Sequence, residues 1–397
     1  MSYDFLLTIA IIMLFTKVFG LTSERVHMPQ VVGALIAGVL VGPSCLGWVG
    51  ETDFLVKAAE IGVIILMFNA GMDTDLDELK TTGFASFIIA LIGVIVPLIG
   101  GVACYLAFDN DPTDPMNMLK AAFIGVVLTA TSVSITVETL REMGKLKSKV
   151  GTAILGAAVI DDILGIIALT LITSVSDPSV NIVAVLVKIV AFFALSLAVG
   201  VLLHKLIEKW MTGHDDKRRY AVISFAFCLL YSFFAEAVFG VADITGAYIA
   251  GLIFANTCRV AYLQDRFDTL SYSLLSPIFF ASIGLKVVLP EMSTTILLFA
   301  VLLVLWAVVS KVVGCGLGAK LCRYSNQDAL RIGVGMISRG EVALIVAQKG
   351  LEVGVVEPVY FTAVILLIVV SSVATPLALK ALFTKMPPVP HPSEAKK

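Results

Sequence analysis

Apolar stretches of about 20 residues recur along the whole chain and constrain its fold more than any other feature. The 397-residue sequence is 58% hydrophobic and only 15% charged, whereas soluble domains carry about 25% charged residues. Inside a bilayer only helices and closed barrels satisfy every backbone hydrogen bond, and apolar stretches of this length are typical of helices. The sequence therefore predicts an all-α polytopic membrane protein with the lipid bilayer as its solvent.

About 13 apolar segments are long enough to cross a bilayer. We expect them at 3–19, 28–49, 54–71, 83–106, 119–140, 149–174, 181–207, 218–239, 241–257, 269–287, 294–318, 328–349 and 357–384. The first segment lacks a basic leader and a small-residue cleavage site, so we expect it to remain as a helix. The proline-rich tail, 386–397, is expected to be disordered and cytoplasmic, with no soluble regulatory domain in the chain.

Basic residues gather in alternate connections between these segments, which gives the chain an orientation. The clusters lie at Arg141–Lys149, at Lys217–Arg219 and at Lys320, Arg323 and Arg331. The connection Asp109–Pro115, in the intervening set, carries only acidic charge. Cytoplasmic loops hold an excess of lysine and arginine. We therefore expect the N-terminus outside and the C-terminus in the cytoplasm.

Two adjacent aspartates, Asp161 and Asp162, lie in the middle of the apolar stretch from Val150 to Thr173. One carboxylate at bilayer depth costs about 2.5–3.5 kcal/mol on insertion scales. Burial also disfavours the charged form of a carboxyl group, so such an acid can exchange protons near neutral pH. A site that attracts cations and also titrates is what a proton-coupled cation carrier needs. The alternative is a buried pair with a structural role only.

Lys311 is the natural partner for one of these aspartates. It lies in an apolar segment, too deep for its ammonium group to reach water easily. Pairing lowers the insertion cost of both charges, and removing either partner would leave a buried charge uncompensated. Adjacent residues of a helix point about 100° apart. We therefore expect one aspartate to pair with Lys311 and the other to face a cation, unless the pair is purely structural.

Short motifs recur in two halves of the chain. Gly33–Gly38 resembles Gly246–Gly251, and Phe68–Gly71 resembles Phe280–Gly284. The two copies are the same number of residues apart along the chain in both cases. A third motif, Ile124-Gly-Val, recurs as Ile332-Gly-Val. The first copies begin on the opposite side of the membrane from the second, so the sequence predicts two inverted-topology repeats. Secondary transporters commonly place their sites near the bilayer midplane, where such repeats meet.

Polar and glycine residues interrupt two segments at corresponding positions of the repeats. These interruptions are Leu128–Thr136 and Gly333–Val342. They predict broken crossover helices, since unwound backbone is tolerated at this depth only around a protein-lined or watery site. The alternative is that serine and threonine hydroxyls bond back within intact helices.

Three further charges lie in or next to the interrupted segments: Glu138, Arg339 and Glu341. Arg339 is expected to neutralise Glu341 or Glu138 and so hold the crossover together. We predict that this network stabilises the structure and does not contact the transported ion.

Five motifs together resemble the monovalent cation:proton antiporter superfamily, in its second large family, over nearly the whole chain. They are Thr129-Ala-Thr-Ser, Ile160-Asp-Asp-Ile, Pro277-Ile-Phe-Phe-Ala-Ser-Ile-Gly-Leu, Ser310-Lys-Val-Val-Gly and Ser338-Arg-Gly-Glu. The resemblance is to electrogenic bacterial sodium/proton antiporters, close to the spore-germination type. In the electroneutral branch an Asn commonly replaces the residue at Asp161 and an Asp often stands at Ser132. This sequence follows the electrogenic pattern at both positions.

The resemblance implies a role for each matching residue. Asp162 would bind the cation and exchange protons, and Asp161 would form a salt bridge with Lys311. Thr129, Thr131 and Ser132 would line the ion site at the crossover. The transported Na⁺ would then be held by Asp162, Asp161, Thr131 and Ser132. No cofactor is expected beyond the transported Na⁺, Li⁺ or K⁺ and H⁺.

The resemblance also implies a homodimer in a bacterial inner membrane, with a dimerisation scaffold and a transport core. The scaffold would comprise 1–72 and 217–287, the core 83–174 and 294–385, and residues 181–208 would link them. We expect a transporter, with no enzymatic activity and no nucleic-acid partner. Potassium/proton exchange by the same fold, a passive cation channel or uniporter, and a symporter of small organic anions are the alternatives. The sequence leaves the choice of cation open.

Overall fold

The computed structural model describes residues 3–25, 28–109, 113–176, 181–212, 217–286, 294–352 and 354–385, and every regular element among them is a helix. The elements of the first half are α1 (Asp4–Arg25), α2 (Gln30–Val41), α3 (Asp53–Asp73), α4 (Leu76–Phe108), α5 (Asn117–Thr129), α6 (Val133–Glu142), α7 (Lys149–Ser176) and α8 (Ile182–Thr212). The elements of the second half are α9 (Lys217–Phe234), η1 (Ala235–Phe239), α10 (Asp243–Phe254), α11 (Val260–Leu270), η2 (Ser271–Leu275), α12 (Ser276–Leu285), α13 (Thr294–Leu321), α14 (Asn326–Gly335), α15 (Glu341–Glu352) and α16 (Pro358–Lys385).

Long apolar helices dominate the fold, as the sequence predicts for a multi-pass membrane protein. Within the described residues, 9 helices are long and apolar enough to cross a membrane, counting Asn117–Glu142 as one. Shorter apolar helices occupy Gln30–Val41, Asp243–Phe254 and Val342–Leu351. Several of the predicted segments therefore form helices shorter than a full span.

Helix ends differ from the predicted bounds where a cap or a proline decides them. Helix α4 begins before the predicted residue 83, because the Asp75 carboxylate accepts the N–H groups of Asp77 and Glu78. Helix α2 ends at Val41, well before residue 49, since Pro43 disfavours helical backbone at Gly42. Neither the Asp75 cap nor the effect of Pro43 can be read from the apolar pattern alone.

The tenth predicted segment, 269–287, is part of a longer helical run. Helix α11 begins at Val260 and continues through η2 into α12. Its residues are polar on one face, so the apolar pattern missed it as a helix. The π-helical turn η2 lies between the polar part of this run, α11, and the apolar part, α12. A π-helical turn contains about one residue more than an α-helical turn.

The two predicted helix interruptions are present. Helix α5 ends at Thr129 and α6 begins at Val133, while α14 ends at Gly335 and α15 begins at Glu341. The alternative of continuous helices with hydroxyl back-bonding is therefore wrong for these two segments. Thr129 does bond back to the Val126 carbonyl, at 2.8 Å, in the last turn before the first break.

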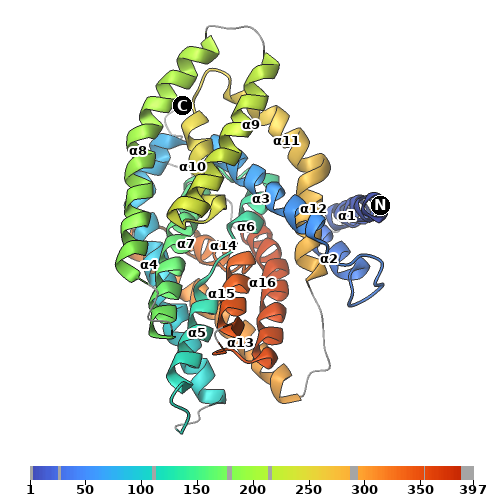
Figure 1. Ribbon diagram of the computed structural model, residues 1–397, viewed down its shortest axis with the longest axis vertical. Coiled ribbons are helices and arrows are strands. Elements are labelled where there is room, and N and C mark those ends of the chain that lie inside the picture. Colours follow the sequence, from blue (N-terminus) through green and yellow to red (C-terminus); the bar gives the residue numbers. More distant parts are fainter. Residues whose placement is uncertain are drawn as a thin grey trace.

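The contacts between helices, whose positions are labelled in Figure 1, separate into two groups. In one group α4 packs between α7 and α13, with α5 and α14 to α16 around them. In the other α3 packs against α10 and α12, and α1 and α2 pack against each other and α12. Helix α8 contacts both groups, through α7 and α10. Otherwise the groups meet mainly where α2 and α3 reach α6 and α16.

Glycines of the repeated motifs allow the closest helix crossings. A Cβ added at Gly38 or Gly284 would collide with backbone of the facing helix, α12 or α2. The same holds for Gly71 and Gly251, which face each other across α3 and α10. The first copy of one motif thus meets the second copy of the other, in two separate helix pairs.

The third repeated motif makes an equivalent contact in the other packing group. A Cβ at Gly125 would lie 2.7 Å from the Leu98 carbonyl oxygen of α4. A Cβ at Gly333 would lie 2.6 Å from the Val312 carbonyl oxygen of α13. Each copy therefore lets a broken helix approach the backbone of the long helix before it in the chain.

We expect Gly71→Ala to lower the free energy of unfolding by about 1–3 kcal/mol, because the added methyl group forces the backbones of α3 and α10 apart. The matched control is Gly83→Ala in α4, where a Cβ meets nothing within 4 Å. That change should leave stability unchanged or raise it by up to about 1 kcal/mol. Thermal unfolding in detergent measures both. Equal midpoints for the two variants would contradict the proposed crossing.

Candidate functional site

The two interrupted segments cross and satisfy each other's backbone. The Ser132 N–H donates to the Ser338 carbonyl oxygen at 2.7 Å, and the Ser338 hydroxyl donates to the Ser132 carbonyl oxygen, also at 2.7 Å. Both residues are buried. Because the helices stop here, these groups would otherwise lack partners in an apolar environment.

Thr136 and Gly340 tighten this crossing. The Thr136 hydroxyl donates to the Gly335 carbonyl oxygen at 2.7 Å, at the end of α14, and lies 3.1 Å from the Ser338 hydroxyl. A Cβ at Gly340 would lie 2.6 Å from the Ser132 hydroxyl oxygen, closer than real Cβ atoms come. Glycine at 340 therefore lets the two unwound stretches touch.

Arg339 lies fully buried in the second interruption. Its guanidinium donates to the carbonyl oxygens of Met336 at 3.2 Å and Ile337 at 3.0 Å, and to that of Ala307 in α13 at 3.4 Å. These first two carbonyls follow the C-terminal end of α14, where a cation is favourable. Arg339 thus holds the broken end of α14 against α13.

The partners expected for Arg339 were the carboxylates of Glu138 and Glu341. The pair with Glu138 is not formed: the nearest cation to that carboxylate, among the described side chains, is the Arg141 guanidinium at 4.0 Å. Glu138 lies on α6 beyond the crossing, one helical turn before Arg141, so it faces a different neighbour. The side chain of Glu341 lies outside the described side chains.

Two serines of α16 hold the same stretch from its other side. The Arg339 N–H donates to the Ser371 hydroxyl oxygen, and the Ser372 hydroxyl donates to the Arg339 carbonyl oxygen, each at 3.0 Å. Sequence reasoning missed these residues. Their signal is a pair of adjacent hydroxyls in the middle of the last apolar segment, where hydroxyl groups usually have a polar partner.

The ion pair expected between Lys311 and one of the aspartates is formed with Asp161. Lys311 Nζ in α13 lies 2.6 Å from Asp161 Oδ1 in α7, and both side chains have no exposed surface. Helix α4 packs between these two helices. A Cβ at Gly93 of α4 would collide with the thiol of Cys315 and lie 3.9 Å from Lys311 Nζ. Glycine at this position therefore lets α13 pack against α4 beside the pair.

Asp162, only 4% exposed, follows Asp161 on α7 and points to another side of that helix. Helix α7 contacts α5 and α6, and the predicted lining residues lie at the end of α5 (Thr129) and in the break between the two helices (Thr131 and Ser132). Within the described residues, Asp161 Oδ2 and the Thr131 hydroxyl oxygen are buried and accept no hydrogen bond. Buried oxygens without hydrogen-bond partners are suited to ligate a cation.

The other two predicted lining residues already use their hydroxyls locally. Thr129 donates to Val126, and the Ser132 hydroxyl lies 3.2 Å from the Ser134 hydroxyl. Their oxygens keep lone pairs that can still face a cation. The geometry thus combines two buried carboxylates, one buried ammonium and unwound backbone.

Comparison with known families gives one match over most of the chain. The model of the family described as "Sodium/hydrogen exchanger, transmembrane" matches residues 9–385.

Curated relatives with high coverage are bacterial antiporters. The chain is 37% identical over 384 residues to the Na⁺/H⁺-K⁺ antiporter GerN of Bacillus cereus, covering 96% of this chain and 97% of that protein. It is 34% identical over 390 residues to a Na⁺/H⁺ antiporter of Enterococcus hirae, covering 96% and 98%. Among solved structures, the sodium proton antiporter MjNhaP1 of Methanocaldococcus jannaschii matches with a TM-score of 0.70 at 17% identity, over 96% of this chain and 98% of that one. At this identity the structural match shows a shared fold.

We expect Lys311→Met to lower the free energy of unfolding by about 3–5 kcal/mol, because it leaves Asp161 buried without its partner. The double variant Asp161→Asn/Lys311→Met removes both charges and should recover most of that loss. Lys188→Met, which replaces an exposed lysine of the apolar helix α8, should change little. Thermal unfolding of the purified protein distinguishes the three. A buried pair that stabilises the fold is excluded if Lys311→Met and Lys188→Met unfold at the same temperature.

Proposed function

The chain belongs to the transmembrane sodium/hydrogen exchanger family, and on that premise we propose that it exchanges Na⁺ or Li⁺ for protons by alternating access through Asp162. The observation that carries this proposal is the buried Lys311–Asp161 pair, directly beside a second buried carboxylate and next to two crossed, broken helices.

Asp162 is the carboxylate that cation and proton share. Its neighbour Asp161 pairs with Lys311, and we assign the cargo to Asp162, which matches the ion-binding carboxylate of the family that the chain resembles. A carboxylate that holds a cation is deprotonated, and one that holds a proton no longer attracts a cation. The two cargoes therefore compete, and each crossing carries one or the other. Thr131 and the unwound backbone of the first break would complete the cation's oxygen shell.

The Asp161–Lys311 pair makes the exchange electrogenic in this proposal. When the cation binds, Asp161 releases Lys311 and contributes its charge to the cation. One proton leaves that pair in this step, in addition to the proton that Asp162 exchanges. More than one proton then moves for each cation, so net charge crosses the membrane.

Potassium is a second candidate cargo. One relative at 37% identity is named as an antiporter of both Na⁺ and K⁺ against protons. Nothing in the carboxylate and hydroxyl chemistry of the site excludes the larger ion, since both are bound by oxygen ligands. Flux of Na⁺, Li⁺ and K⁺ driven by a pH gradient in proteoliposomes would rank the three.

The two packing groups correspond to a moving core and a static scaffold in this proposal. We assign α4 to α7 and α13 to α16 to the core, and α1 to α3 and α9 to α12 to the scaffold, with α8 linking them. The sparse contact between the groups supports this division. So does an apolar cavity of about 180 Å³ at their boundary, lined by residues of α2, α12 and α16.

The equivalent glycine contacts support two inverted repeats. The first copy of each motif crosses the second copy of the other motif in the same way, at Gly38 of α2 with α12 and at Gly251 of α10 with α3. Thirteen membrane segments, an outside N-terminus and a cytoplasmic C-terminus remain part of the proposal, as do the homodimer and a bacterial inner membrane. The exposed apolar faces of α1, α8 and α9 are available for lipid or a second copy.

We expect Asp162→Asn to abolish cation/proton exchange in proteoliposomes, because an amide neither holds a proton for transport nor attracts a cation. The matched control is Asp77→Asn at a largely exposed carboxylate near the start of α4, which should transport at the normal rate. Exchange by Asp162→Asn at the rate of the unsubstituted protein would exclude a shared carboxylate.

We expect the exchange rate of the unsubstituted protein to respond to an imposed membrane potential, because net charge moves in each cycle. Lys311→Ala should lose this response or slow severely. The measurement compares initial rates of pH-gradient-driven flux with the potential clamped at several values. A rate that is indifferent to potential in the unsubstituted protein would show electroneutral exchange.

A further inference from the structure

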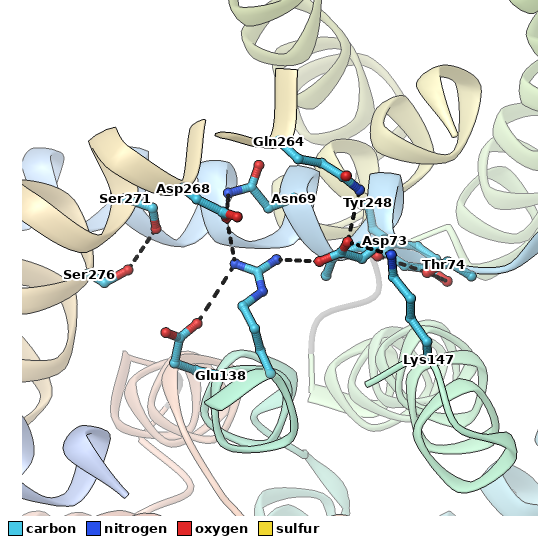
Figure 2. A network of polar contacts seen from close by, with 12 residues as sticks. Asn69, Asp73, Thr74, Glu138, Lys147, Tyr248, Gln264, Asp268, Ser271 and Ser276 are labelled. Atoms are coloured by element: carbon cyan, nitrogen blue, oxygen red, sulfur yellow. Dashed lines mark hydrogen bonds and ion pairs between the residues drawn. The ribbon is translucent and has the colours of Figure 1, made fainter. Parts of the chain in front are cut away.

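Arg141, at the end of α6, joins the core to the scaffold through two carboxylates. Its guanidinium lies 3.4 Å from Asp73 of α3 and 3.3 Å from Asp268 of α11. The Glu138 carboxylate, on the same helix, lies 4.0 Å from the guanidinium, and Figure 2 shows Glu138, Asp73 and Asp268 around this contact. The three side chains that form the bridge thus come from three different helices in the two packing groups.

A second cation and two amides hold this arrangement in place. Lys147, in the connection between α6 and α7, lies 3.2 Å from Asp73 Oδ1. The Gln264 amide donates to the same oxygen at 2.8 Å, and the Asn69 amide donates to Asp268 at 2.8 Å. Scaffold residues therefore fix the positions of the two carboxylates, and the core supplies both cations (Figure 2).

A third contact crosses the same boundary at the same end of the core. The Glu142 carboxylate accepts the N–H groups of Gln30 at 2.8 Å and Val31 at 3.2 Å. These N–H groups begin α2, and a helix N-terminus favours an anion. The end of α6 is thus tied to α2, α3 and α11 of the scaffold.

Ion pairs at the opposite end of the core stay within the core. Lys120 of α5 lies 3.0 Å from Asp114 and 3.2 Å from Glu357, next to α16. The Met116 N–H and then Lys120 hold the pKa of the Asp114 carboxyl below its ordinary value, so this pair is charged at neutral pH. These contacts make the core rigid without attaching it to the scaffold.

We propose that Arg141, Lys147, Asp73 and Asp268 form a cytoplasmic latch, which closes the cytoplasmic end of the core against the scaffold and must break in every transport cycle. The proposal rests on the proposed function, since it requires the core to move against the scaffold. All four residues lie at helix ends or connections that the positive-inside pattern assigns to the cytoplasm.

The exposure of the latch suits reversible opening. The side chains of Arg141 and Asp73 are 19% and 18% exposed, so solvent screens their attraction only in part. Lys147 and Asp268 are 64% and 51% exposed, so water can replace these contacts when the latch opens.

The test locks the latch covalently and reversibly. In a background with Cys45, Cys258 and Cys322 replaced by serine, Asp73→Cys/Arg141→Cys is joined by a short bismethanethiosulfonate cross-linker. We expect the reduced double variant to exchange cations for protons, the cross-linked form to lose most of that activity, and a reductant to restore it. The matched control joins Asp114→Cys/Lys120→Cys within the core and should keep transporting after cross-linking.

Two outcomes separate the latch from the proposed function. Full activity of the cross-linked Asp73→Cys/Arg141→Cys protein, alongside normal exchange by the unsubstituted protein, would overturn the latch alone. Absence of exchange in the unsubstituted protein would overturn the proposed function instead.

A second measurement, hydrogen–deuterium exchange, does not depend on transport, so it also tests the latch in variants whose transport is impaired. We expect Arg141→Gln to raise deuterium uptake in 260–270 and 138–148, and Lys120→Gln to leave both segments unchanged. Equal uptake in the two variants would also overturn the latch.

Discussion

The fold depends on a charge that cannot leave the membrane interior. Lys311 and Asp161 have no exposed surface, and either one alone would be costly to keep ionised there. The pair therefore ties α13 to α7, and α4 packs against both helices with a glycine at 93, where a Cβ would collide with the thiol of Cys315. Asp162 follows Asp161 on α7 and is also buried.

The broken helices show how exposed backbone polar groups are satisfied at this depth. Unwinding exposes N–H and carbonyl groups that lipid cannot satisfy, and each break satisfies the other through Ser132 and Ser338. Arg339 and the serines of α16 add further hydrogen bonds to the second break. The guanidinium of Arg339 lies against the C-terminal end of α14, where it donates to backbone carbonyl oxygens.

In the proposed division, close packing inside the core contrasts with partly exposed polar contact at its boundary. Glycine crossings and the Lys120 pairs fix helices of the core to one another. The contacts of Arg141, Lys147 and Glu142 with the scaffold are ionic or hydrogen-bonded and partly exposed. A body that is stiff within itself and joined to its neighbour by separable polar contacts is suited to move as one unit.

The sequence by itself determined the membrane class, most of the helical segments, the two interruptions and the need for a partner to Lys311, because apolarity and the cost of buried charge act locally along the chain. Helix geometry left open which aspartate is that partner; the family resemblance pointed to Asp161, and the pair is formed in the structure. Only the tertiary structure decided that Arg339 caps carbonyls and does not pair with Glu138, and that Ser371 and Ser372 support the crossover. The bridge from Arg141 to Asp73 and Asp268 was equally hidden in the sequence. Such choices depend on which helix faces lie side by side, and side-chain direction across a helix interface is set by packing among segments far apart in the chain.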